Sequence, residues 1–192
     1  MSERAPSRTF IVYVEDKPGV LNRVASLFRR RAYNIESLTV GHTERPGVSR
    51  MTIVSTISEG AAHRVVANIY KLVNVLSVED VTGSSTVARS LALVKVEASD
   101  DLRHRLMQIV RVFRARVIDL APQSLIIEIT GGEDKVNALV EVLRPFNIIE
   151  MVRTGQVVMT RSLRPESSQQ KQEQERESPK PAAQTVEASH SV

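Results

Sequence analysis

The chain of 192 residues contains no cysteine and no tryptophan. The missing cysteines exclude disulfide bonds, thiolate nucleophiles and cysteine-ligated zinc or iron-sulfur sites. Aromatic residues make up only 4% of the sequence, whereas hydrophobic residues make up 42%, so we expect an aliphatic core. No apolar run approaches the roughly 18 residues of a membrane-spanning helix, and the start, MSERAPSRTF, lacks the apolar stretch of a secretory signal. We therefore expect a soluble, cytoplasmic protein.

Residues typical of catalytic or metal sites are also scarce. The four histidines, His42, His63, His104 and His190, do not have the spacing of metal ligands. The chain has no G-x-S-x-G, H-E-x-x-H, Walker A or G-x-G-x-x-G motif. We expect no catalytic residue, no metal site and no cofactor in this chain, and an enzymatic function of its own is the less favoured alternative.

The charge balance is only mildly basic. Lys and Arg number 26 and Asp and Glu number 22, which gives a formal net charge of +4 with both signs interspersed. The most basic run, FRRRA at Phe28 to Ala32, ends a predicted helix, where arginines complement the negative end of the helix dipole. The predicted sheets also lack the clustered aromatic residues that stack on bases. We therefore expect neither a nucleic-acid nor a membrane partner.

The first half of the ordered chain switches between strand and helix periodicity. Apolar residues at helical spacing form two predicted helix faces, one with Val20, Val24 and Leu27 and one with Val65 and Ile69. The predicted strands are TFIVYV (Thr9 to Val14), NIESLTVG (Asn34 to Gly41), SRMTIVSTI (Ser49 to Ile57) and NVLSVEDVTG (Asn74 to Gly83), with the hairpin loop HTERPG between the second and third. The predicted order is β-α-β-β-α-β.

The second half repeats this order, and the closing strands are similar, NVLSVEDVTG against NIIEMVRTG. We predict an α+β protein of two tandem ferredoxin-like βαββαβ units, each with both helices on one face of an antiparallel sheet. The predicted domains cover residues 8–84 and 85–162. Residues 1–7 and the tail at 163–192, which is rich in Gln, Glu, Ser, Lys and Pro, are predicted to be disordered. The sequence does not decide what covers the open face of each sheet.

The junction EDKPGVL, between the first strand and the first helix, is unusual. We expect Pro18 to occupy the first helical position, where its missing N–H costs nothing. Gly19 then lies in the first turn, although glycine in a helix interior costs roughly 0.5 to 1 kcal/mol relative to alanine. Gly19 has two interpretations: it lets the turn close or the helix pack tightly, or it opens the first-turn N–H groups to an anionic ligand.

The neighbours of Gly19 favour a zwitterionic ligand. Asp16 offers an acceptor for a cation beside the N–H donors of the helix, and a free amino acid carries two charges at that separation. The surrounding side chains Val20, Leu21 and Ile35 are aliphatic. A small branched aliphatic amino acid suits such a pocket.

The segment from Val14 to Gly41, together with SRMTIVS and NVLSVEDVTG, closely resembles the regulatory (small) subunits of acetohydroxyacid synthase, also called acetolactate synthase. The likeness extends from about Arg8 to Ser162. The first repeat resembles the ACT domain of that family, an amino-acid-sensing module. D-x-P-G-x-L alone marks ACT domains in general, whereas YNIESLTV and SRMTI are specific to the small subunits.

The resemblance implies a regulatory subunit without an active site. Such subunits bind the large catalytic subunit, raise its activity and confer feedback inhibition, chiefly by valine, in the biosynthesis of valine, isoleucine and leucine. The catalytic partner forms acetolactate from two pyruvates and is expected to hold thiamine diphosphate, Mg²⁺ and FAD. The alternative is a stand-alone tandem-ACT regulator that senses an amino acid and acts on another partner.

The resemblance also implies an effector site between the ACT domains of a homodimer. One protomer contributes the strand-to-helix loop, and the other contributes the start of the second strand. Some members of the family carry Asn at the position of Asp16. The charged Asp16 of this chain should hold the ammonium group of a ligand but repel its carboxylate. The second repeat lacks the Pro-Gly pair at EASDDLRHR and is assigned to catalytic-subunit contact or dimerisation. The predicted effector residues are Asp16, Lys17, Pro18, Gly19, Val20 and Leu21 from one protomer and Asn34 and Ile35 from the other.

Overall fold

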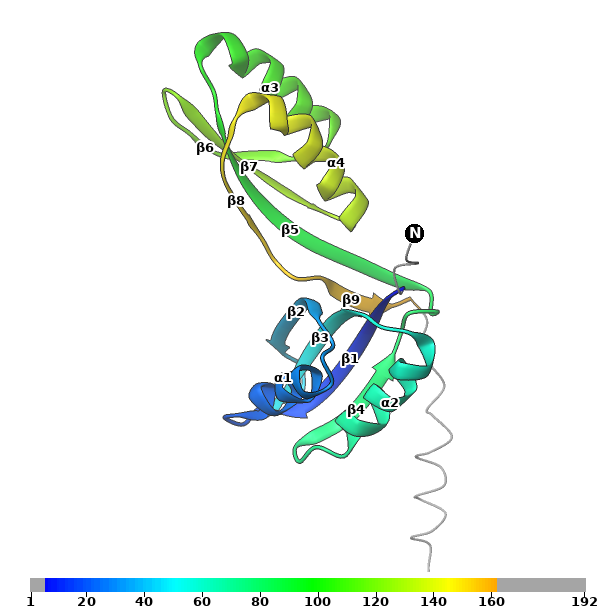
Figure 1. The fold of residues 1–192 in the computed structure, drawn as a ribbon. Helices are drawn as coiled ribbons and strands as arrows, with labels where there is room; N and C mark the ends of the chain where they lie inside the picture. Colours follow the sequence, from blue (N-terminus) through cyan, green and yellow to red (C-terminus); the bar gives the residue numbers. More distant parts are fainter. Residues whose placement is uncertain (1–5, 162–192) are drawn as a thin grey trace, which may run out of the picture. The chain divides into compact units, whose positions relative to one another are not determined.

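The computed structural model describes residues 6–161 (Figure 1). The disorder predicted for residues 1–7 and 163–192 falls outside this range except at residues 6 and 7, and there the prediction is wrong for Ser7, which begins β1 and pairs with Thr56 of β3. The elements of the first half are β1 (Ser7–Glu15), α1 (Val20–Arg30), β2 (Ile35–His42), β3 (Val48–Thr56), α2 (Glu59–Tyr70) and β4 (Val75–Asp80). Those of the second half are β5 (Thr86–Glu97), α3 (Asp100–Val112), β6 (Arg116–Leu120), β7 (Ser124–Gly131), α4 (Glu133–Leu143), the 3₁₀ helix η1 (Arg144–Phe146), β8 (Ile148–Arg153) and β9 (Val157–Thr160).

The first half forms an antiparallel sheet in the order β2-β3-β1-β4, with α1 and α2 on one face (Figure 1). Helix α1 buries one apolar face and ends in Arg29 and Arg30, which lie in the last turn as predicted. The core between helices and sheet is mainly aliphatic, with Phe10 and Phe28 fully buried. The predicted β-α-β-β-α-β order is therefore confirmed for this half.

The second half repeats the architecture. Its antiparallel sheet has the order β6-β7-β5-β8, and α3 and α4 lie together on one face (Figure 1). A separate apolar core lies between them, with Ile127, Leu106 and Leu139 fully buried. The prediction of two tandem ferredoxin-like units is confirmed.

Strand β9 is a feature that the sequence analysis did not predict. The first four residues of β5, Thr86 to Arg89, pair with β9, while the rest of β5 belongs to the second sheet. Val158 of β9 is buried against Ile11 and Val81, so β9 covers part of the face of the first sheet that the helices leave open. The sequence signal was weak because only one side chain of this four-residue strand is buried.

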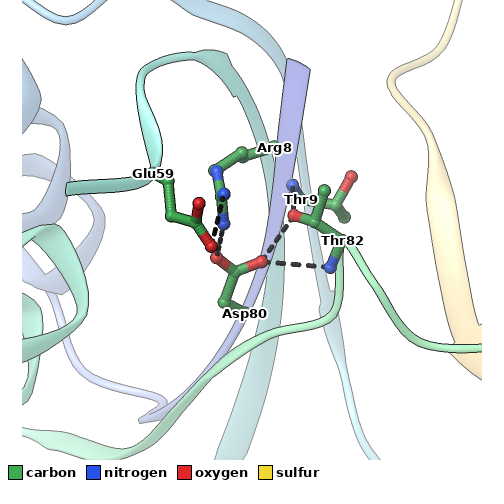
Figure 2. A network of polar contacts seen from close by, with 5 residues as sticks. All are labelled: Arg8, Thr9, Glu59, Asp80 and Thr82. Carbon is green, nitrogen blue, oxygen red and sulfur yellow. Dashed lines mark hydrogen bonds and ion pairs between the residues drawn. The ribbon is translucent and has the colours of Figure 1, made fainter. Parts of the chain in front are cut away.

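A polar network ties β1 to β4 and α2 (Figure 2). The Arg8 guanidinium donates to Asp80 over 2.8 Å and lies 3.7 Å from Glu59. The other oxygen of Asp80 accepts from the hydroxyl and the backbone N–H of Thr82, and the N–H of Thr9 donates to the Thr82 hydroxyl. Burial raises the pKa of Asp80, but the hydrogen bonds from Thr82 and Arg8 and the charge of Arg8 outweigh it, so the pKa lies below its ordinary value.

Replacing Asp80 by Asn is therefore expected to destabilise the protein by about 1 to 2 kcal/mol at pH 7, because charge-assisted hydrogen bonds are lost. A lowered folded-state pKa contributes stability above the unfolded-state pKa of about 3.9 and loses it as the pH falls through the folded-state value. The difference in free energy of unfolding between wild type and variant should accordingly shrink below about pH 4. Urea denaturation at several pH values measures it. Asp119→Asn on β6, where the carboxylate is exposed, is the control and should change little; an equal loss in both variants would contradict the assignment.

Candidate functional site

The junction between β1 and α1 differs from its prediction in one respect. Helix α1 begins at Val20, and Gly19 is its N-cap, with φ 83° and ψ −7° in the left-handed region. Pro18 lies in the preceding turn and not at the first helical position. The prediction that Pro18 starts the helix is wrong, because the left-handed residue that follows it delays the helix by two positions.

The backbone conformation explains the glycine at position 19. L-residues adopt a φ of +83° only with strain, whereas glycine does so readily. A Cβ atom on Gly19 would meet nothing within 4 Å, so tight packing is not the reason. Closure of the turn thus requires Gly19, and the space in front of it is open.

The N-terminus of α1 presents unpaired donors. The N–H of Val20 makes a long bond of 3.4 Å to the Lys17 carbonyl, and the N–H of Arg23 donates to the Gly19 carbonyl over 3.1 Å. Within the described residues, the N–H groups of Gly19, Leu21 and Asn22 have no hydrogen-bond partner. The first turn of α1 carries no acidic side chain, whereas the first turns of α2, α3 and α4 each carry one or two. Among the four α-helices of residues 6–161, α1 is therefore the one whose positive end no acidic side chain of its own first turn neutralises.

The Asp16 carboxylate faces the β2–β3 hairpin. Ser49 Oγ donates to Asp16 Oδ1 over 3.3 Å, and His42 Nδ1 lies 3.4 Å from Asp16 Oδ2. The backbone N–H of Asp16 also donates to the Gly47 carbonyl over 2.8 Å. His42 was predicted to lie in the hairpin loop but is the last residue of β2, and neither His42 nor Ser49 was predicted as a partner of Asp16. Only the strand register, in which His42 is paired with Ser49, brings them there.

The remaining loop residues have different surroundings. The Lys17 ammonium pairs with Glu15 over 2.6 Å, and this bond, together with one from Asn74, lowers the pKa of Glu15. The side chain of Val20 is 2% exposed and belongs to the core, so a ligand can contact only its backbone. Leu21 is 42% exposed and provides the apolar surface of the loop.

Asn34 and Ile35 lie at the opposite end of the sheet. Ile35 pairs with Ser55, which pairs with Arg8 at the start of β1, whereas Asp16 follows the last residue of β1. The seven residue-to-residue steps from Arg8 to Glu15 span about 23 Å at about 3.3 Å per step. A single chain therefore does not bring the two predicted halves of the effector site together. Asn34 is exposed, and its backbone carbonyl accepts a hydrogen bond from Ser55 Oγ over 2.6 Å.

Known proteins share this architecture and sequence. Residues 10–77 match the "AHAS small subunit-like ACT domain" and residues 89–162 match "Small subunit of acetolactate synthase". The chain belongs to the acetolactate synthase small subunit family. A probable acetolactate synthase small subunit of Archaeoglobus fulgidus is 48% identical over 153 residues, covering 80% of this chain and 96% of that protein.

Two further relatives of the acetolactate synthase small subunit family span most of the chain. The small subunit of Mycolicibacterium smegmatis is 43% identical over 164 residues, covering 85% of this chain and 96% of that protein. The crystal structure of the small subunit from Thermotoga maritima matches with a TM-score of 0.76 and 37% identity, covering 82% of this chain and 99% of that chain. The α+β fold of two ACT-like units is thus that of the family.

The described residues contain neither a metal-binding cluster nor a membrane-spanning helix. No group of three or more His, Asp or Glu side chains in residues 6–161 is placed to hold a metal ion. No helix of the described part is long and apolar enough to cross a membrane.

Proposed function

We propose that this chain is the regulatory subunit that activates the catalytic subunit of acetolactate synthase and makes it sensitive to feedback inhibition by valine. In this proposal valine binds between the ACT domains of two copies of the chain. The catalytic partner holds thiamine diphosphate, Mg²⁺ and FAD and forms acetolactate from two pyruvates in the cytoplasm, and this chain itself needs no cofactor.

The observation that carries the proposal is the open N-terminus of α1 beside Asp16. The unpaired N–H groups of Gly19, Leu21 and Asn22 suit a carboxylate at the positive end of the helix. The partly exposed Asp16 carboxylate suits an ammonium group. The exposed side chain of Leu21 suits an aliphatic side chain, and the three features together match a branched-chain amino acid.

The positions of Asn34 and Ile35 support a site shared by two chains. They lie about 23 Å along the sheet from Glu15, which precedes Asp16, in the same chain, so they can meet a ligand at Asp16 only from a second copy. Ile35 begins β2 and Asn34 directly precedes it, and β2 is an edge strand of its sheet with one neighbour, β3. A homodimer formed through the ACT domains therefore completes the site in this proposal.

The second unit lacks the features that suit an effector in the first unit. At the equivalent junction α3 begins after Ser99, whose φ of −63° is ordinary, and Asp100 and Asp101 occupy its first turn. These carboxylates disfavour a second anion at that helix N-terminus. We assign the second unit to contact with the catalytic subunit or to dimerisation.

Titration calorimetry of the purified chain with valine, leucine and isoleucine tests the proposal. We expect valine to bind at one molecule per chain, because a symmetric pair of chains makes two equivalent sites. The absence of binding heat for all three amino acids up to about 10 mM, well above the range of a regulatory ligand, would contradict it. Binding without recovery of the acetolactate synthase catalytic subunit in a pull-down would favour the stand-alone regulator.

A further inference from the structure

The β2–β3 hairpin holds Asp16 from two sides. His42 and Ser49 are paired in the β2–β3 ladder, and Ser49 is also paired with Val14, two residues before Asp16. Directly opposite residues of an antiparallel pair project to the same face of the sheet. This register explains why one hydroxyl and one imidazole each reach a different oxygen of the Asp16 carboxylate.

These contacts leave Asp16 available to a ligand. At 3.3 and 3.4 Å they are longer than the usual hydrogen bonds of about 2.8 to 3.0 Å. A carboxylate also accepts about four hydrogen bonds, so two remain. Ser49 is 5% exposed and fixed in the sheet, whereas the side chains of Asp16 and His42 are 49% and 83% exposed. The buried Ser49 hydroxyl thus orients the Asp16 carboxylate, while the exposed side of the carboxylate stays accessible to a ligand from solvent.

The other charged groups of this region have partners of their own. Lys17 pairs with Glu15 at 2.6 Å, Arg45 lies 3.8 Å from Glu44, and Arg50 donates to the Val158 carbonyl. Asp16 is the carboxylate within 4 Å of the His42 ring among the described residues. Histidine changes its charge between pH 5 and 8, whereas a free amino acid stays zwitterionic over that range. An imidazolium at His42 would compete with the ammonium group of a ligand for Asp16.

We propose that Ser49 and His42 are positioning residues of the effector site, and that His42 makes effector binding weaker at acidic pH. Ser49 orients the Asp16 carboxylate toward the ammonium group of the amino acid. His42 leaves that carboxylate free when neutral and occupies it when protonated. This inference rests on the proposed function.

Titration calorimetry with valine at about pH 8 and pH 5.5 tests it on the full chain. When the pH is lowered from about 8 to 5.5, we expect the valine affinity of the wild type to fall about five- to tenfold further than the valine affinity of His42→Gln. Ser49→Ala should weaken binding about three- to tenfold at both pH values, and Ser49→Thr, which restores the hydroxyl, should recover part of it. His42→Asn is a second neutral variant, and thermal unfolding verifies that each variant is folded.

The matched control is His63→Gln, which removes an exposed histidine from α2 and should keep the pH dependence of the wild type. The inference is overturned if His42→Gln and His42→Asn keep that dependence, or if Ser49→Ala binds valine as the wild type does. If the wild type binds none of the three branched-chain amino acids at either pH, the proposed function itself has failed. The two failures are therefore distinguishable.

Discussion

The Gly19→Asp variant is expected to lose valine affinity by about fivefold to nearly a thousandfold while it still activates the catalytic subunit. The new carboxylate would lie close to the carboxylate of the bound amino acid at the N-terminus of α1. Like charges about 4 Å apart cost about 1 to 4 kcal/mol at effective dielectric constants of about 80 to 20. Acetolactate synthase reconstituted with this variant should therefore be active and resistant to valine.

The left-handed backbone of Gly19 determines the control for this experiment. Any side chain at φ 83° is strained, but Asn and Asp tolerate this region better than other residues. Gly19→Asn has nearly the same size and the same backbone strain without the charge. Its loss of valine affinity should be clearly smaller than that of Gly19→Asp. Titration calorimetry measures both, and equal affinities of Gly19→Asp and wild type would show that the site lies elsewhere.

Replacing Gly155 by Val should lower the free energy of unfolding by about 3 kcal/mol, at the upper end of the usual cost of overpacking. Gly155 lies between β8 and β9 and is in close contact with β2. A Cβ atom there would lie 2.5 Å from Thr39 Oγ1, 2.8 Å from Ser37 Oγ and 2.9 Å from the Leu38 carbonyl oxygen. The backbone carbonyl cannot move without disturbing the pairing of β2 with β3. The substitution also strains the hydrogen bond of 2.9 Å from the Gln156 N–H to Ser37 Oγ.

Urea denaturation measures this effect, and Gly83→Val is its matched control. Gly83 is exposed, and a Cβ atom on it would meet nothing within 4 Å. Its replacement should change the free energy of unfolding by no more than about 0.5 kcal/mol. If both variants unfold at the same urea concentration as the wild type, the contact of Gly155 with β2 does not contribute to stability.

The repeated β-α-β-β-α-β order was predictable because it depends on local periodicity. Apolar residues at helical spacing in α1 and compact β-branched runs in β1 and β3 bury one face each, and this pattern is visible without knowledge of the partner surface. β9 was not predictable in this way. It is short, and Val158 is buried only because Ile11 and Val81 are placed opposite it by the rest of the chain.

The sequence alone identified the strand-to-helix junction as the place where a glycine has a purpose, because a glycine beside a proline at a helix start contradicts helix propensity. It could not supply the reason, which is the left-handed φ of Gly19 before the helix. Nor could it supply the partners of Asp16, since His42 and Ser49 are 26 and 33 residues away in the chain. Strand pairing between distant segments brings these side chains together. The register of β2, β3 and β1 depends on which side chains of each strand are buried in the core, and only the tertiary structure decides this register.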